Sequence, residues 1–277
     1  MSYISAIRDR DEVRVWERNN GEREMVTYPS PYYFFTPHDD GDYKSIFGQK
    51  LMRHDFETYQ DMSRAKQECD SNHVEKFESD ISPEFKVLSE HYYNKPAPAL
   101  NVTMLDIEVD YKPELGFSSV ENPYAPINAV ALYHAWEKRM LVYAVPPDEK
   151  TPNQEDFLKE MEEIAPLPTD IEVEVHFCKN ESELLLYLLA EIEDSDLLVG
   201  WNSDAFDIPY IAKRIESVLG KRYLTRMSFP LAGPPRFREY TDRYGMLREG
   251  IELHGRTTAD YMQLFMKYEV AERPSYK

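Results

Sequence analysis

One stretch, residues 100–109, most restricts what this chain can fold into. Its sequence is Leu-Asn-Val-Thr-Met-Leu-Asp-Ile-Glu-Val. Successive side chains of a strand point to opposite faces, and here both faces are largely apolar until Asp106 and Glu108, which share one face. Apolar residues on both faces are typical of a strand covered on both sides. We therefore expect a central strand whose carboxyl-terminal end, where open α/β sheets place their sites, carries two carboxylates.

The same four residues, Asp-Ile-Glu-Val, recur at positions 170–173 in different surroundings. There the polar residues fall on one face of the strand and the apolar residues on the other. The polar face consists of Asp170, Glu172, Glu174 and His176. This alternation predicts a half-exposed strand with a solvated face that needs no function. Unpaired carboxylates in a covered strand instead require protons or hard cations such as Mg²⁺ or Mn²⁺. Of the two copies, the first, with Asp106 and Glu108, therefore supplies the candidate metal ligands.

Strands alternate with helices from residue 100 onward. Further strands are expected over residues 127–133, 140–145, 171–177 and 196–201, and helix and loop over 150–169. Asn180, with Glu183 three positions later, predicts the capped start of a helix. A second helix is expected from about residue 208 to 219. This alternation predicts an α/β domain with a mixed sheet.

The first 99 residues are expected to form a separate α+β domain. Asn19-Asn-Gly21 separates two strand-like stretches and predicts a β-hairpin. Residues 54–80 are highly charged and are expected to be partly helical. Residues 94–99, Asn-Lys-Pro-Ala-Pro-Ala, are typical of a linker. We therefore predict two domains, 1–99 and 100–277.

Composition narrows the class of protein. Hydrophobic residues make up 42% of the chain, which indicates a globular fold, and the net charge is −19. That charge argues against broad contact with phosphates. It leaves either a soluble acidic protein or a metal-dependent enzyme that reaches nucleic acid through a local patch. The densest basic cluster, Lys213, Arg214, Lys221, Arg222 and Arg226, is most simply a solvated helix face.

Targeting features point to the cytoplasm. The chain has only two cysteines, Cys69 and Cys178, which form neither a disulfide framework nor a metal site. It has no signal-peptide pattern and no apolar run of the roughly 18 residues needed to cross a bilayer. We expect a cytoplasmic protein that makes no contact with membranes.

A second polar motif follows the strand that ends at Trp201. It reads Asn202-Ser-Asp-Ala-Phe206-Asp207, and its last two residues come where a helix begins. Capping of that helix is one explanation for Asp207, and also for Asp204. The other explanation is a third carboxylate brought to the same sheet edge as Asp106 and Glu108.

The two motifs together resemble those of a known family. Leu105-Asp106-Ile-Glu108 resembles the first exonuclease motif of family B DNA polymerases, and Asn202 through Asp207 resembles the second. The resemblance is nearest to the replicative polymerases of T-even-type phages. It extends over essentially the whole chain, including residues 21–34, 47–50, 126–130 and 258–276. It implies an N-terminal domain followed by a ribonuclease-H-like 3′→5′ exonuclease domain with a mixed sheet.

The resemblance also implies a two-metal site for Mg²⁺ or Mn²⁺ that removes mispaired nucleotides from DNA ends. Asp106 would bridge the metals, Glu108 would orient the attacking water, and Asp207 would complete the site. Phe117 resembles a phenylalanine that stacks on terminal bases, although core packing is an equally open explanation. Asn202 and Phe206 would also contact DNA, either a single-stranded 3′ end or a primer-template.

The third motif of that family, a tyrosine followed four positions later by aspartate, does not occur in the 277 residues. Tyr187 and Tyr268 have glutamate there instead. We therefore expect a chain truncated within the exonuclease domain, lacking the fourth carboxylate and the polymerase palm. It would be a weak exonuclease at best, without polymerase activity. It could be a fragmentary gene product, an incomplete reading frame, or one piece of a split polymerase whose second chain supplies the missing parts.

Three hypotheses follow. The first is the proofreading portion of a phage-type polymerase that acts in the cytoplasm of a bacterial host. The second is a non-catalytic module that binds nucleic acid or a partner chain. The third, an unrelated acidic α/β domain with chance motifs, is disfavoured by the extent of the resemblance.

Overall fold

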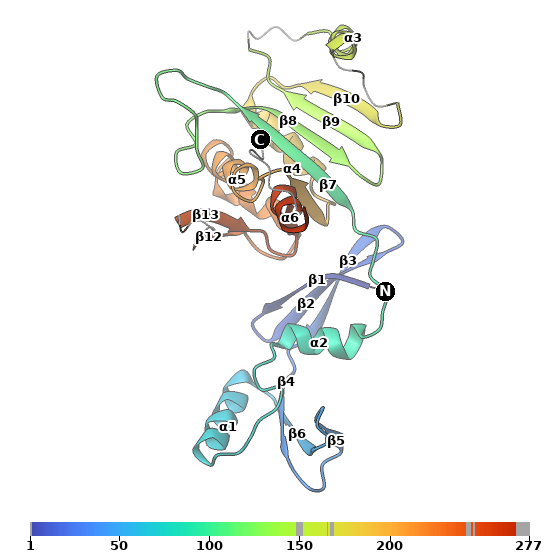
Figure 1. The fold of residues 1–277 in the computed structure, drawn as a ribbon, viewed down its shortest axis with the longest axis vertical. Coiled ribbons are helices and arrows are strands. Elements are labelled where there is room, and N and C mark those ends of the chain that lie inside the picture. The colour runs from blue at the N-terminus through green and yellow to red at the C-terminus, as the bar shows by residue number, and fades with distance from the viewer. Residues whose placement is uncertain are drawn as a thin grey trace. The chain divides into compact units, whose positions relative to one another are not determined.

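The computed structural model describes residues 2–147, 152–164, 166, 169–241, 245 and 247–269. The chain forms two compact units, Met1–Ala99 and Leu100–Lys277, each with its own sheets and helices (Figure 1). Within the described ranges, no helix is long and apolar enough to cross a membrane. Residues 270–276, the last part of the stretch 258–276 that resembles the family, lie outside the described residues.

The first unit contains two antiparallel three-stranded sheets. One has the order β1-β2-β3 and the other β4-β6-β5. Their strands are β1 (Ser2–Asp9), β2 (Glu12–Asn19), β3 (Glu22–Pro29), β4 (Tyr32–Pro37), β5 (Tyr43–Lys44) and β6 (Lys50–Phe56). The predicted hairpin is confirmed, because Asn20 and Gly21 join β2 to β3 with positive φ angles of 50° and 89°.

Each sheet of the first unit packs against one helix. Helix α2 (Pro83–Tyr92) places Val87 and Tyr92 against Val13 and Val15 of β2. Helix α1 (Tyr59–Ser71) packs Met62 against the aromatic residues of β4. The charged stretch 54–80 is thus partly helical, as its sequence predicts.

The second unit is built on a six-stranded mixed sheet of order β10-β9-β8-β7-β11-β14. Its strands are β7 (Val102–Val109), β8 (Ile127–His134), β9 (Arg139–Ala144), β10 (Glu172–Phe177), β11 (Leu197–Gly200) and β14 (Thr257–Asp260). The first strand, β7, is antiparallel to β8 and parallel to β11. The predicted α/β class with a mixed sheet is confirmed, and β7 does lie inside the sheet.

Five helical segments and a hairpin complete the described part of this unit. They are α3 (Gln154–Ile164), α4 (Glu181–Glu191), α5 (Asp207–Val218), the 3₁₀ helix η1 (Lys221–Met227), α6 (Tyr261–Tyr268) and the hairpin β12 (Arg236–Thr241)–β13 (Leu247–Glu252). The predicted start of α4 is confirmed, because the side chain of Asn180 accepts a hydrogen bond from Glu183 N at 3.0 Å. Leucines of α4 and isoleucines of α5 pack with the buried side chains of the sheet into one core.

One prediction about β7 is wrong. Leu105 and Ile107 are buried in the core beneath α4 and α5, but the opposite face is open, and Met104 there is 47% exposed. Asp106 and Glu108 lie on that open face. An apolar side chain at the surface is common, so Met104 did not require a second covering layer.

The second copy of the tetrapeptide is confirmed only in part, because strand β10 starts at Glu172 and both Asp170 and Ile171 precede it. Strand β10 is an edge strand, with Glu172 exposed and Val175 buried. The two copies therefore differ by position in the sheet, interior against edge. The predicted difference, that only the first copy lies in a strand covered on both faces, is not observed.

Candidate active site

Asp207 is brought directly to strand β7. Asp207 is the first residue of α5, and the N-cap position that the sequence offered for it is taken by Phe206. The Asp207 Oδ1 atom instead accepts a hydrogen bond from Ile107 N at 3.1 Å. Because Ile107 lies between Asp106 and Glu108, the third carboxylate reaches the strand that carries the first two.

The Asp207 carboxyl is strongly perturbed. The residue is only 4% exposed. Its pKa is raised to about 7, first by burial and then by the nearby charge of Asp106, while hydrogen bonds from the backbone amides of Ile107 and Asp207 partly oppose the rise. Loss of surrounding water also raises the pKa of the Asp106 carboxyl. Two carboxylates that compete for protons in this way are suited to share a cation.

The carboxylates fit part of a metal site. Asp106 and Asp207 are close enough for one charge to shift the pKa of the other, and hard oxygen donors of this type suit Mg²⁺ or Mn²⁺. Glu108 shares the open face of β7 with Asp106. Among the described residues, however, no three His, Cys, Asp or Glu side chains converge into a cluster that could hold an ion. The assignment of Glu108 as a third ligand stays a prediction.

A tight turn between β11 and α5 sets the position of Asp207. A Cβ atom at Gly200 would lie 2.6 Å from Ser203 Cβ and 2.8 Å from Leu105 O, so only glycine fits between β7 and the turn. Asn202 has a positive φ of 59°. These two residues let the chain reverse close to β7 and enter α5 with Asp207 facing the strand.

Asp260 is a residue whose role in this turn the sequence did not reveal. It is buried at the end of β14, beside Gly200 of β11. Its Oδ1 atom accepts hydrogen bonds from Asn202 N and Met262 N, both at 3.0 Å, so it holds the turn and caps α6. The aspartate before a helical pattern is a capping signal, but nothing in the sequence pairs it with Asn202.

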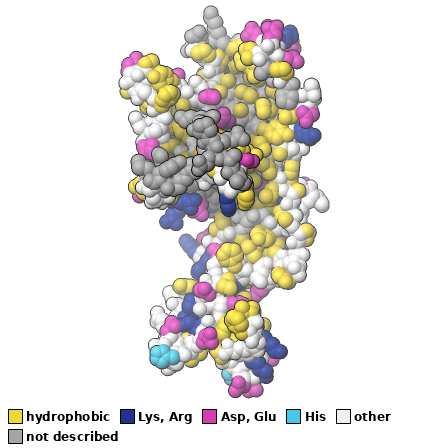
Figure 2. Space-filling model, viewed as in Figure 1, with side chains coloured by type: hydrophobic (Ala, Val, Ile, Leu, Met, Phe, Trp, Pro, Cys, Tyr) yellow, Lys and Arg dark blue, Asp and Glu magenta, His cyan; other side chains and the backbone are white. Residues whose placement is uncertain are grey.

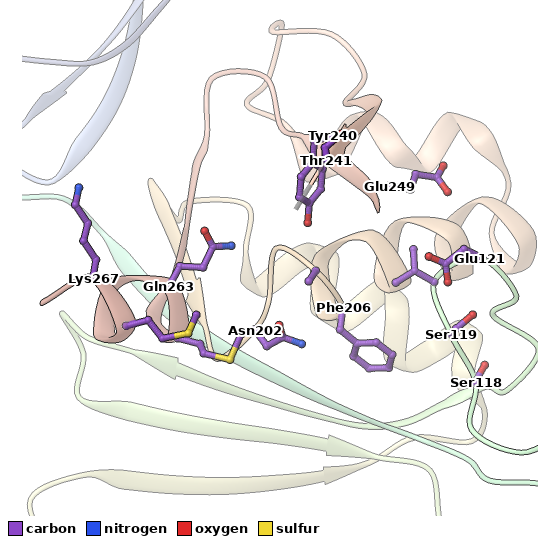
Figure 3. Close-up of a pocket in the computed structure, with 14 residues that line it drawn as sticks. Ser118, Ser119, Glu121, Asn202, Phe206, Tyr240, Thr241, Glu249, Gln263 and Lys267 are labelled. Atoms are coloured by element: carbon purple, nitrogen blue, oxygen red, sulfur yellow. The ribbon is translucent and has the colours of Figure 1, made fainter. Parts of the chain in front are cut away.

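A cavity of about 760 Å³ opens beside this turn (Figure 3). Asn202 and Phe206 line it, together with residues from α6, the β12–β13 hairpin and the loop after Phe117. The other lining residues are Ser118, Ser119, Val120, Glu121, Ala205, Tyr240, Thr241, Glu249, Met262, Gln263, Met266 and Lys267. The predicted contact residues Asn202 and Phe206 are thus at a cavity next to Asp207.

Comparison with known proteins decides the family. Residues 53–277 match the exonuclease domain of DNA polymerase family B. This chain belongs to that family. The predicted resemblance is confirmed, and with it the fold class. The family match begins within the first compact unit.

Two phage polymerases are similar to this family B chain. It is 25% identical to the DNA-directed DNA polymerase of Escherichia phage RB69 over 270 residues, which is 92% of this chain and 29% of that protein. It is 32% identical to the DNA-directed DNA polymerase of Enterobacteria phage T4 over 99 residues, 35% of this chain and 11% of that protein. The chain therefore spans less than a third of the length of these relatives.

Phe117 of the exonuclease domain is a surface residue. Its side chain is 89% exposed, so core packing does not explain it. Its ring centroid is 5.1 Å from that of Tyr111, in the same loop between β7 and β8. An exposed aromatic ring is available for stacking, and the residues that follow it line the cavity.

The basic cluster of the exonuclease domain is largely engaged in ion pairs. Lys213 Nζ lies 2.5 Å from Glu249 Oε2, and Arg226 pairs with Glu193 at 3.3 Å. Arg214 forms a two-point pair with Glu181 and is mostly buried. A freely solvated helix face is therefore the wrong description for these three residues. Three of the five cations of the cluster are already paired with glutamates.

Proposed function

We propose that this chain carries a 3′→5′ proofreading exonuclease site, formed around Asp106, Glu108 and Asp207, that removes mispaired nucleotides from DNA ends. One observation carries the proposal. The buried carboxylate of Asp207 reaches from α5 to the backbone of β7, where the nearby charge of Asp106 raises its pKa. Membership of the family B exonuclease domain supports the same reading.

The three carboxylates have separate tasks in this proposal. Asp106 and Asp207 would hold Mg²⁺ or Mn²⁺, and Glu108, on the same face of β7, would orient the attacking water. Bound divalent ions would activate that water and stabilise the leaving oxygen of the phosphodiester. The hydrogen bond from Ile107 N holds the Asp207 carboxyl against β7, beside Asp106. Phe117, Asn202 and Phe206 would receive the single-stranded 3′ end.

The proposal places this site within a larger polymerase. The similar phage proteins are DNA-directed DNA polymerases of more than three times this length. We assign residues 1–99 to the N-terminal domain of such an enzyme and residues 100–277 to its exonuclease domain. DNA synthesis and the third exonuclease motif would then come from another part of the polymerase, in a second chain if the enzyme is split. The partner nucleic acid would be a primer-template.

The test uses a DNA single strand labelled at its 3′ end and incubated with the chain in Mg²⁺ or Mn²⁺. Weak, metal-dependent release of label is expected, because the sequence has no Tyr-x3-Asp motif to supply a fourth carboxylate. Asp106→Ala and Asp207→Ala should abolish the release. Asp170→Ala is the matched control, since it alters the same tetrapeptide at an exposed turn before the edge strand β10 and should change nothing.

Two results would count against the proposal. Release that survives Asp106→Ala would overturn the site. Strong release by the wild-type chain, lost in Asp106→Ala, would instead overturn the need for a fourth carboxylate. A chain that binds the strand but neither binds Mn²⁺ nor cleaves would be the non-catalytic binding module.

A further inference from the structure

Three side chains on one face of α5 make long-range contacts. Asp207, Tyr210 and Arg214 are spaced three and four residues apart, so they lie along one stripe of the helix. Asp207 contacts β7. Tyr210 and Arg214 contact the loop between β7 and β8, which carries Phe117 and passes beside α5 (Figure 1). One helix therefore touches both the carboxylate strand and the loop of the exposed phenylalanine.

Tyr210 makes the central contact of this stripe. The residue is fully buried, and its hydroxyl donates a hydrogen bond to Ala125 O at 2.7 Å. The same hydroxyl lies 2.8 Å from Ser118 Oγ. Ser118 in turn donates to Asn122 O at 3.2 Å. The Tyr210 hydroxyl thus joins the two ends of the segment 118–125.

Phe117 and Ser118 have opposite environments although they are neighbours. Phe117 is 89% exposed, and Ser118 is 8% exposed. The position of the exposed ring is therefore set by the anchored residue after it. Tyr124 adds a second anchor, because its hydroxyl donates to Gly116 O just before the ring. Arg214 adds a third by donating to Pro123 O at 3.0 Å.

We propose that Tyr210 is a positioning residue that fixes Phe117 relative to Asp207. This inference rests on the proposed function, because it takes Phe117 as the ring that stacks on the 3′-terminal base. Asp207 and Tyr210 are one helical turn apart on α5. A rigid α5 therefore sets the spacing between the stacking ring and the cleavage carboxylates, and so selects which phosphodiester bond of a single strand meets them.

The first test needs no nucleic acid. Amide hydrogen exchange of residues 117–125 is measured by mass spectrometry in the wild-type chain and in Tyr210→Phe, which removes only the hydroxyl. Exchange there should rise about tenfold, the factor expected for losing a buried hydrogen bond. Tyr143→Phe is the matched control. It deletes another buried tyrosine hydroxyl of the same core, bonded to Glu191 at 2.8 Å, and should leave this loop unchanged.

The second test measures stacking. A single strand with 2-aminopurine as its 3′-terminal base is bound in Ca²⁺, and fluorescence quenching and affinity are recorded. Phe117→Ala and Tyr210→Phe should each reduce the quenching and weaken binding by about five- to tenfold. In the Phe117→Ala background, Tyr210→Phe should have no further effect, because it acts through that ring. A purely structural role would give additive effects.

The outcomes separate the two proposals. If Phe117→Ala weakens stacking while Tyr210→Phe alters neither exchange nor stacking, the positioning role is overturned and the proposed function stands. If Tyr210→Phe lowers affinity equally with and without Phe117, the role is also overturned. If Phe117→Ala changes nothing, the stacking function fails and the positioning role with it. Ser118→Ala removes the other partner of the hydroxyl and should reproduce Tyr210→Phe.

Discussion

At the scale of single residues, burial destabilises the ionised form of the Asp207 side chain. Its pKa of about 7 means that the folded chain keeps this proton at pH values where the unfolded chain, with an ordinary pKa near 3.8, has released it. Between about pH 4 and pH 7 the folded state therefore binds more protons, so stability falls as pH rises through this window. Above pH 7 the full penalty of a buried charge beside Asp106 remains.

Asp207→Asn should therefore stabilise the metal-free chain at alkaline pH. Asparagine keeps an oxygen for Ile107 N but carries no charge. The gain in unfolding free energy at pH 8.5 should be a few kcal/mol. Its upper limit is about 4 kcal/mol, which corresponds to a pKa raised from 3.8 to about 7. At pH 4 the two proteins should be equally stable, because Asp207 is then protonated. Urea unfolding at the two pH values measures this, and equal stability at pH 8.5 would contradict the raised pKa.

Gly200 is the second residue on which the site depends. Gly200→Ala should destabilise the chain by about 1–3 kcal/mol, because its Cβ would meet Ser203 and the carbonyl of Leu105. It should also weaken metal binding, since the displaced turn carries Asp207. Gly220→Ala is the control. It meets nothing within 4 Å and costs only the strain of its positive φ, so Mn²⁺ affinity should be unchanged. Unfolding and Mn²⁺ titration measure both effects.

At the scale of elements, β7 shows what sequence patterns can and cannot establish. Its limits, its interior position and its carboxylates follow from local pattern. The covering of its faces does not, because Met104 would have the same sequence context under a helix or in solvent. The role of Asp260 in the turn could not be predicted from the sequence for a related reason. Its contact with Asn202 joins residues 58 positions apart, and only the pairing of β11 with β14 brings them together.

Helix α5 depends on the ion pair between Arg214 and Glu181. Both side chains are at least 85% buried, and Glu181 Oε1 also accepts a hydrogen bond from Ile127 N at 2.8 Å. Arg214→Met should cost about 3–5 kcal/mol, because it leaves a buried carboxylate without its partner. Adding Glu181→Gln should restore much of the loss, since the amide oxygen still serves Ile127. Urea unfolding of the two single variants and the double variant tests this, and strictly additive losses would contradict it.

At the scale of the whole molecule, the order of strands and helices beyond residue 100 follows closely from alternating patterns. The family follows from two short motifs whose residues meet at β7. Neither the alternating patterns nor the two motifs predict the electrostatics of the open face of β7, because its charges come from separate elements. The overall charge of the chain is −19, and three residues of its densest basic cluster, Lys213, Arg214 and Arg226, are already paired with glutamates.

This charge distribution predicts that divalent ions decide both the strength of DNA binding and the sign of a mutation's effect. In EDTA the phosphates meet the bare carboxylate of Asp106, so Asp106→Asn should strengthen binding of a single strand about fivefold at low salt, the effect of removing one repulsive charge. In Ca²⁺ the same change should weaken binding, because the carboxylates then hold the ion that attracts the phosphate. Asp170→Asn, exposed and remote from β7 in sequence, should have no effect in either buffer. Fluorescence anisotropy in the two buffers measures the reversal. Weaker binding by Asp106→Asn in both would mean that the carboxylate contacts DNA directly and that no cation stands between them.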